Sequence, residues 1–155
     1  MAMLFRGIQN GRVDDKGRLK LPALVRQRVE DRYQDSHVFI TSLDGETMRV
    51  YPLKEWEIVE ERLSKKSPDG NALDGEVKDK ILFQTQRFGA EETLDNQGRI
   101  LVPAVLREAA GMRGEVRILW QSNHLLVLNA ERFDAATQQN RLTADDRRYA
   151  ANLGV

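Results

Sequence analysis

Apolar and polar positions alternate at 18–21, which reads RLKL, and the stretch at 99–102 reads RILV, with the same start but a leucine in place of the lysine. This period of two predicts strands with one apolar face and one outward face. Each stretch ends at a proline, Pro22 or Pro103, which suits the first turn of a helix. In the helix predicted at 23–33, apolar side chains recur along one face: Val25, Val29 and Tyr33. Gly111 is expected to end the helix that follows Pro103.

Each predicted helix is followed by a pattern typical of a β-hairpin. In the first copy the strands are expected at 37–42 and 48–51, joined by LDGE. In the second they are expected at 116–120 and 125–128, joined by QSNH. The chain therefore repeats one order of elements.

A helical segment with an aromatic residue ends each copy: 53–63 with Trp56, and 130–140 with Phe133. Between the copies we expect a loop at 67–75 and a helix at 76–88. That helix has a mostly apolar stripe: Val77, Ile81, Gln84 and Phe88. The polar stretch 141–155 is expected to be either disordered or a short peripheral helix.

The similarity between the copies extends to residue identity. Residues 13–27 read VDDKGRLKLPALVRQ, and residues 94–108 read LDNQGRILVPAVLRE. At a constant offset of 81, six of the fifteen positions are identical: Asp14/Asp95, Gly17/Gly98, Arg18/Arg99, Pro22/Pro103, Ala23/Ala104 and Arg26/Arg107. The agreement indicates an internal duplication.

Each repeated residue has a physical use in a turn. An aspartate three positions before a glycine can accept hydrogen bonds from loop N–H groups, and glycine adopts a positive φ without steric cost. If Leu19 points into the core, Arg18 and Lys20 point outward. An alternative reading is open: Arg18 and Arg99 pair structurally with Asp14 and Asp95.

The duplication predicts how the chain is organised. A single unit of this size leaves open sheet edges and too little core, whereas two units that interlock their strands avoid both problems. We therefore expect a mainly β protein with peripheral helices (α+β) and pseudo-twofold symmetry. The predicted division is a first unit at 4–66, a linker and helix at 67–90, a second unit at 91–135 and a polar C-terminal tail at 136–155.

Composition narrows the class of protein. The 155 residues include 24 basic and 24 acidic side chains, so the formal net charge is zero. Residues 1–28 hold seven basic and two acidic side chains, a local charge of +5. This predicts either a local basic surface or an ordinary solvated face. The absence of cysteine excludes disulfides and thiolate zinc sites. With no signal peptide or membrane span recognisable in the sequence, we expect a cytoplasmic protein.

An enzyme is not expected. His37 and His124 are far apart in the sequence, and each is interpreted as a surface histidine. The chain has no His-Glu-x-x-His, no phosphate-binding glycine loop and no nucleophile elbow. No metal, cofactor or small-molecule substrate is predicted.

These residues together resemble a known family. The paired Asp-x-x-Gly-Arg turns, the opening FRG at 5–7 and YPLKEWE at 51–57 are similar to the MraZ family of bacterial transcriptional regulators, which consist of two SpoVT-AbrB-type units. The resemblance covers about residues 4–133. It implies a double-split, swapped-hairpin β-barrel assembled into rings. It also implies binding to direct repeats in the promoter of the protein's own operon of cell-division and cell-wall genes, and a place at the nucleoid.

The resemblance also implies which residues serve DNA binding. The arginine of each turn is expected to contact DNA, and the aspartate to shape the turn. From the residues, we expect the DNA-binding side chains to be Arg18, Arg99, Lys16, Lys20 and Gln97. The turn-shaping residues are expected to be Asp14, Gly17, Asp95 and Gly98. Arg12 is interpreted as a peripheral basic residue.

Oligomerisation is expected on two grounds. One subunit offers only about four phosphate-neutralising groups, so repetition would raise affinity. In addition, LLVL at 125–128 is apolar on both faces and needs a cover, from a neighbouring subunit or from the helix at 76–88. The alternative function is a ring-forming interaction scaffold whose arginine turns bind an acidic partner. An AbrB-type antitoxin is disfavoured because both units lie in one chain.

Overall fold

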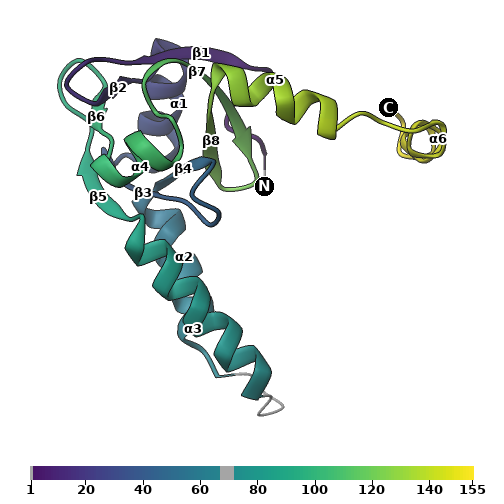
Figure 1. Cartoon of the computed structure of the whole chain (residues 1–155), viewed down its shortest axis with the longest axis horizontal. Helices are drawn as coiled ribbons and strands as arrows, with labels where there is room; N and C mark the ends of the chain where they lie inside the picture. The colour runs from purple at the N-terminus through teal and green to yellow at the C-terminus, as the bar shows by residue number, and fades with distance from the viewer. Residues whose placement is uncertain (1, 67–71) are drawn as a thin grey trace.

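A computed structural model describes residues 2–66 and 72–155 (Figure 1). The strands in these ranges are β1 (Gln9–Val13), β2 (Arg18–Lys20), β3 (His37–Thr41), β4 (Met48–Pro52), β5 (Ala90–Thr93), β6 (Arg99–Leu101), β7 (Gly114–Gln121) and β8 (His124–Asn129). The helices are α1 (Ala23–Tyr33), α2 (Leu53–Ser64), α3 (Ala72–Arg87), α4 (Ala104–Ala109), α5 (Ala130–Gln139) and α6 (Ala144–Asn152). The predicted hairpins and helices are present, with ends shifted by a few residues.

The strands form one antiparallel sheet in the order β5-β3-β4-β8-β7-β1-β2-β6. Its two end strands, β5 and β6, lie against each other, so the sheet curls into a nearly closed barrel with helices around it. The α+β barrel expected from the sequence is confirmed.

The two copies exchange strands. The first strand of each copy pairs with the hairpin of the other: β1 with β7, and β5 with β3. The remaining strand pairings between the copies join equivalent strands, β2 to β6 and β4 to β8. Leu19 and Ile100 are equivalent under the offset of 81 and are also direct partners in β2 and β6. The pseudo-twofold axis therefore passes through this pair.

The core lies inside the barrel, where the apolar faces of both copies meet. Leu19 and Ile100 are at most 1% exposed. Buried side chains of the helices after the two prolines, including Val25 and Leu106, belong to the same cluster. Gly111 follows α4 with a φ of +61°, as expected for a residue that ends a helix.

The sequence pattern missed β1 and β5. Strand β1 has no inward apolar series because Gly11 occupies an inner position: a Cβ there would lie 2.8 Å from Cδ1 of Ile118. Strand β5 reads AEET and is only partly buried. Each copy therefore begins with a strand that carries no clear period-two signal.

The segment between the copies differs from the prediction. Helix α3 begins at Ala72, so 72–75 is helical rather than loop, while 67–71 lies outside the described residues. Helices α2 and α3 pack on each other as an arm that projects from the barrel (Figure 1). Phe88, at the base of the arm, is buried, but Val77 is 46% exposed, so the predicted apolar stripe is wrong at its outer end. The physical reason is that this part of α3 extends beyond the barrel.

Helix α5, rather than the helix after the linker, packs against β7 and β8. It helps to bury Leu128, while Leu126 stays half-buried. Between α5 and the hairpin remains an apolar hollow of about 320 Å³, lined in part by Leu119, Leu126 and Phe133. The neighbouring-subunit cover proposed for 125–128 stays a prediction.

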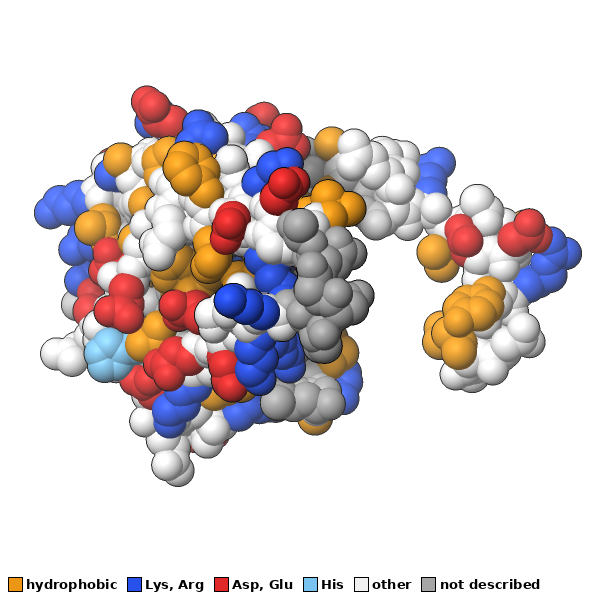
Figure 2. Space-filling view, turned by 90° about the horizontal axis from the view of Figure 1, so that it is seen from below, with side chains coloured by type: hydrophobic (Ala, Val, Ile, Leu, Met, Phe, Trp, Pro, Cys, Tyr) orange, Lys and Arg blue, Asp and Glu red, His pale blue; other side chains and the backbone are white. Residues whose placement is uncertain are grey.

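The C-terminal stretch ends in a helix that stands away from the barrel (Figures 1 and 2). Thr143 and Asp146 form a capping box at the start of α6, which explains why this polar segment is helical. Of the two expectations for the tail, the peripheral helix is confirmed. Among the described residues, no helix has the length and apolar character that a membrane span requires.

The two histidines differ in environment. His37 is exposed, as predicted, and its Nδ1 lies 2.6 Å from Oδ1 of Asp35. His124 is only 4% exposed and its ring lies 4.7 Å from that of Tyr51, so the surface interpretation is wrong. Burial lowers the pKa of His124 to about 4.

Candidate nucleic-acid interface

The first arginine turn connects β1 to β2 and is organised by Asp14. Its Oδ1 accepts hydrogen bonds from the backbone N–H groups of Lys16 (3.0 Å) and Arg18 (2.9 Å). Its Oδ2 accepts a bond from Nε of Arg18 at 3.1 Å. Gly17 has a φ of +82°, the left-handed conformation that glycine tolerates best.

The second turn, between β5 and β6, repeats this geometry. Oδ1 of Asp95 accepts bonds from the N–H groups of Gln97 and Arg99, both at 2.9 Å, and Oδ2 accepts a bond from Nε of Arg99 at 2.8 Å. Gly98 has a φ of +74°. The N–H donated by the arginine, followed by its side-chain bond, lowers the pKa of each aspartate despite some opposing desolvation. Both carboxylates are therefore charged at neutral pH.

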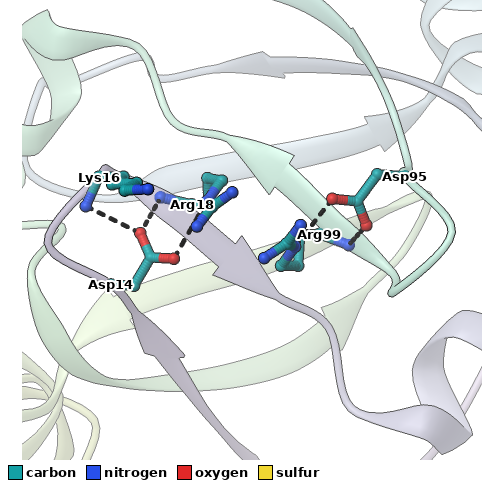
Figure 3. A network of polar contacts seen from close by, with 5 residues as sticks. All are labelled: Asp14, Lys16, Arg18, Asp95 and Arg99. Carbon is teal, nitrogen blue, oxygen red and sulfur yellow. Dashed lines mark hydrogen bonds and ion pairs between the residues drawn. The ribbon is translucent and has the colours of Figure 1, made fainter.

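The two arginines lie next to each other, with the two aspartates to either side (Figure 3). Their side chains are 31% and 25% exposed. Each arginine pairs with the aspartate of its own turn, as the alternative interpretation of the sequence proposed. In both pairs the hydrogen bond is donated by Nε of the arginine. Within the described residues, neither Nη1 nor Nη2 of Arg18 or Arg99 donates a hydrogen bond to another residue. The ion pair therefore orients each guanidinium and leaves its terminal nitrogens for a ligand.

The sheet register places further basic side chains in line with these arginines. Arg99 is directly opposite Lys20, and Lys20 is directly opposite Arg12. Direct partners in an antiparallel sheet share a face, so the three residues form one row across β6, β2 and β1. Arg18 is the diagonal neighbour of Arg99 on the same face. We call Arg12, Arg18, Lys20 and Arg99 the basic face.

The sequence had suggested that Arg12 is peripheral, but the structure places it in this row. It lies beside Lys20 in the row, and Glu115 of β7 is its partner on the other side. Recognising β1 as a strand would have revealed this, because the turn at Asp14 then fixes the register of the hairpin. Next to Arg12 is an open hollow of about 620 Å³, lined in part by Lys20 and Arg117.

The basic face is not symmetric. Leu101 occupies the second-copy position equivalent to Lys20 and is 46% exposed. Gln97 stands in the position of Lys16, and both side chains lie exposed at the tips of their turns. The first copy therefore contributes most of the charge.

The described residues contain no group of three or more His, Asp or Glu side chains arranged to hold a metal ion. The chemistry that the face offers is the recognition of an anion by guanidinium and ammonium groups on three neighbouring strands, β1, β2 and β6.

The fold and the site together define a duplicated, strand-swapped β-barrel protein with paired arginine turns. Comparisons with known proteins identify its family. The profile of the MraZ protein family, described as "antitoxin-like", matches residues 89–152. The Transcriptional regulator MraZ of Acidobacterium capsulatum is 40% identical over 152 residues, 98% of this chain and all of the relative. Its namesake in Koribacter versatilis is 36% identical over the same shares of both chains. That of Hydrogenovibrio crunogenus is 31% identical over 136 residues, 86% of this chain and 85% of the relative.

The chain therefore belongs to the MraZ family of transcriptional regulators. The resemblance drawn from the two turns and YPLKEWE is confirmed. Transcriptional regulators are generally not enzymes, which agrees with the sequence prediction.

Proposed function

We propose that the protein is a sequence-specific DNA-binding regulator of its own division and cell-wall operon, which binds promoter direct repeats as an oligomeric ring. The observation that carries this proposal is the single row of Arg99, Lys20 and Arg12, with Arg18 diagonal to it, on one outer face. The relatives named as transcriptional regulators support the DNA-binding class.

The basic face fits the shape of a DNA groove. The major groove admits a two-stranded β-ribbon, and β2 with β6 is such a ribbon at the pseudo-twofold axis. Arginine forks bind phosphate oxygens or the O6 and N7 atoms of guanine. Because Asp14 and Asp95 hold Nε, little side-chain entropy is lost when the terminal nitrogens bind. In this proposal Lys16 and Lys20 contact phosphates, and Gln97 reads a base edge.

Repetition of the chain would supply the affinity that one chain lacks. Each neutralised phosphate contributes about −0.9 to the salt slope, so about four cationic groups make one chain a weak binder at physiological salt. Several chains on repeats spaced about one helical turn apart would bind with a high effective concentration. This is the physical reason to propose a ring acting on direct repeats.

The experiment is a titration of the full-length protein with the DNA fragment upstream of its own gene. A shuffled fragment of the same length and base composition is the control. We expect the promoter fragment to bind about 10³-fold tighter or better, and log affinity to fall linearly with log salt for both fragments.

Two outcomes would overturn the proposal. Equal binding to both fragments would remove sequence specificity. Failure to bind either fragment, together with salt-sensitive binding to polyglutamate, would favour the interaction scaffold for an acidic partner.

Replacement of Arg12 by alanine tests the extent of the basic face. We expect the magnitude of the salt slope to fall by about 0.9 per bound chain, because one phosphate contact is lost, with little change in sequence preference. Arg6→Ala is the control, since Arg6 is exposed and lies outside the β1–β2 ladder. An unchanged slope for Arg12→Ala would place Arg12 outside the interface.

A further inference from the structure

Arg26 and Arg107 are equivalent under the offset of 81, and each contacts the arginine turn of the other copy. A Cβ placed on Gly17 would lie 2.6 Å from Nη1 and 2.7 Å from Cδ of Arg107. A Cβ placed on Gly98 would lie 2.8 Å from Cδ of Arg26. The glycine of each turn is thus covered by an arginine from the opposite copy's helix.

The backbone links the same pairs. The Val102 N–H donates to the carbonyl oxygen of Gly17 at 2.8 Å, and the Leu21 N–H donates to that of Gly98 at 2.9 Å. Val102 and Leu21 immediately precede the prolines that start α4 and α1. Each turn is therefore joined to the strand end and the helix of the other copy through a reciprocal set of side-chain and backbone contacts.

The contacts of these arginines are those of packing groups. Nε of Arg26 is 3.3 Å from Oε1 of Glu30, which is its only ion-pair partner among the described residues. In the second copy, the position equivalent to Glu30 is Gly111, so Arg107 has no such carboxylate partner. The buried Nε of Arg107 has no hydrogen-bond partner in the described part of the chain. The half-buried guanidinium of Arg107 lies against Gly17 and has no acceptor for its Nε. Its position is explained by the cover that it gives to Gly17.

We infer that Arg26 and Arg107 are positioning residues, each of which fixes the arginine turn of the opposite copy. Arg107 holds the turn of Arg18, and Arg26 holds the turn of Arg99. Both copies are then needed for either turn to be rigid. The consequence for DNA rests on the proposed function, but the structural inference does not.

Amide hydrogen exchange on the free protein tests the inference without DNA. Arg107→Ala is expected to speed exchange of the Val102 amide by about tenfold or more and to leave the Leu21 amide unchanged. Arg26→Ala is expected to produce the opposite pattern. Arg113→Ala is the control, because Arg113 lines the same hollow as Arg107 beside the first turn but is not among the atoms nearest Gly17. Equal acceleration of both amides by either variant, or of neither, would overturn the inference.

Should Arg107→Ala fail to fold, Arg107→Lys replaces it. Lysine keeps the aliphatic stem and the charge but loses the planar guanidinium, so a smaller increase at Val102 alone is expected. The same increase at Leu21 would overturn the inference.

DNA affinity gives a second, crossed readout. Arg107→Ala combined with Arg18→Ala is expected to cost less than the product of the two single fold-changes, because both act through one turn. Combined with Arg99→Ala, the fold-changes should multiply. Multiplication in both combinations would count against the positioning role. If neither turn arginine affects DNA binding, the proposed function fails while the exchange pattern still decides the inference.

Discussion

The double variant Arg18→Ala, Arg99→Ala is expected to bind its promoter fragment about 10³-fold more weakly than the wild type. Each arginine places two terminal guanidinium nitrogens on the basic face, held there by the Nε bond to Asp14 or Asp95. A contact of this kind contributes about 1–3 kcal/mol, and about 1.4 kcal/mol corresponds to a tenfold change in affinity. The measurement is a binding isotherm at fixed salt, followed by circular dichroism melting.

A matched control removes two positive charges elsewhere. Arg62 and Lys66 are exposed at the end of α2, on the arm that leaves the barrel. Their double alanine variant should keep nearly full affinity. The arginine variant should melt close to the wild type, because an exposed ion pair adds less than about 1 kcal/mol. Unchanged DNA affinity would show that the two arginines do not serve DNA binding. A lost thermal transition would show that they serve the structure.

Acidification from pH 7 to pH 5 is expected to lower the free energy of unfolding by about 2 kcal/mol through His124. Its pKa is about 4 in the folded barrel, against about 6.5 in the unfolded chain. Between these two values the unfolded state binds more protons, so stability falls as the pH falls through this window. For a chain of 155 residues the loss corresponds to a melting temperature lower by roughly 4–8 °C.

The variant His124→Phe tests this assignment, because it keeps a ring against Tyr51 and cannot titrate. Its stability should change much less between pH 7 and pH 5. His37 is the internal control: Asp35 raises its pKa, so its contribution is present at low pH and is lost as the pH rises. The slope of His37→Gln should therefore be at least as steep as that of the wild type. An unchanged slope in His124→Phe would contradict the assignment.

The sequence predicted the elements whose signals are local. The turns depend on Asp14, Gly17 and their counterparts, and α1 and α4 start directly after prolines. The residues that form these elements are therefore also the ones that predict them from the sequence. Strand β1 was missed because its inner position is Gly11, where the side chain of Ile118 leaves no room for an apolar residue. The burial of His124 depends on β4, far away in the chain, and no local pattern reports it.

The candidate site divides in the same way. Duplication and alternation pointed to Arg18, Arg99 and Lys20 as outward residues of one surface, and the register brings them together. Arg12 joins them only once β1 is paired with β2. The contact of Arg107 with Gly17 depends on the exchange of strands between copies, which repeat analysis alone does not place.

The central β2–β6 pair has a consequence for the direction of reading. A surface with strict twofold symmetry presents the same groups to both strands of a duplex and so favours palindromes. Here Lys20 faces Arg99, while Arg18 faces Leu101, so the ribbon has a distinguishable head and tail. Chains bound at successive sites along a promoter would all point the same way, so tandem rather than mirrored sites suit this ribbon.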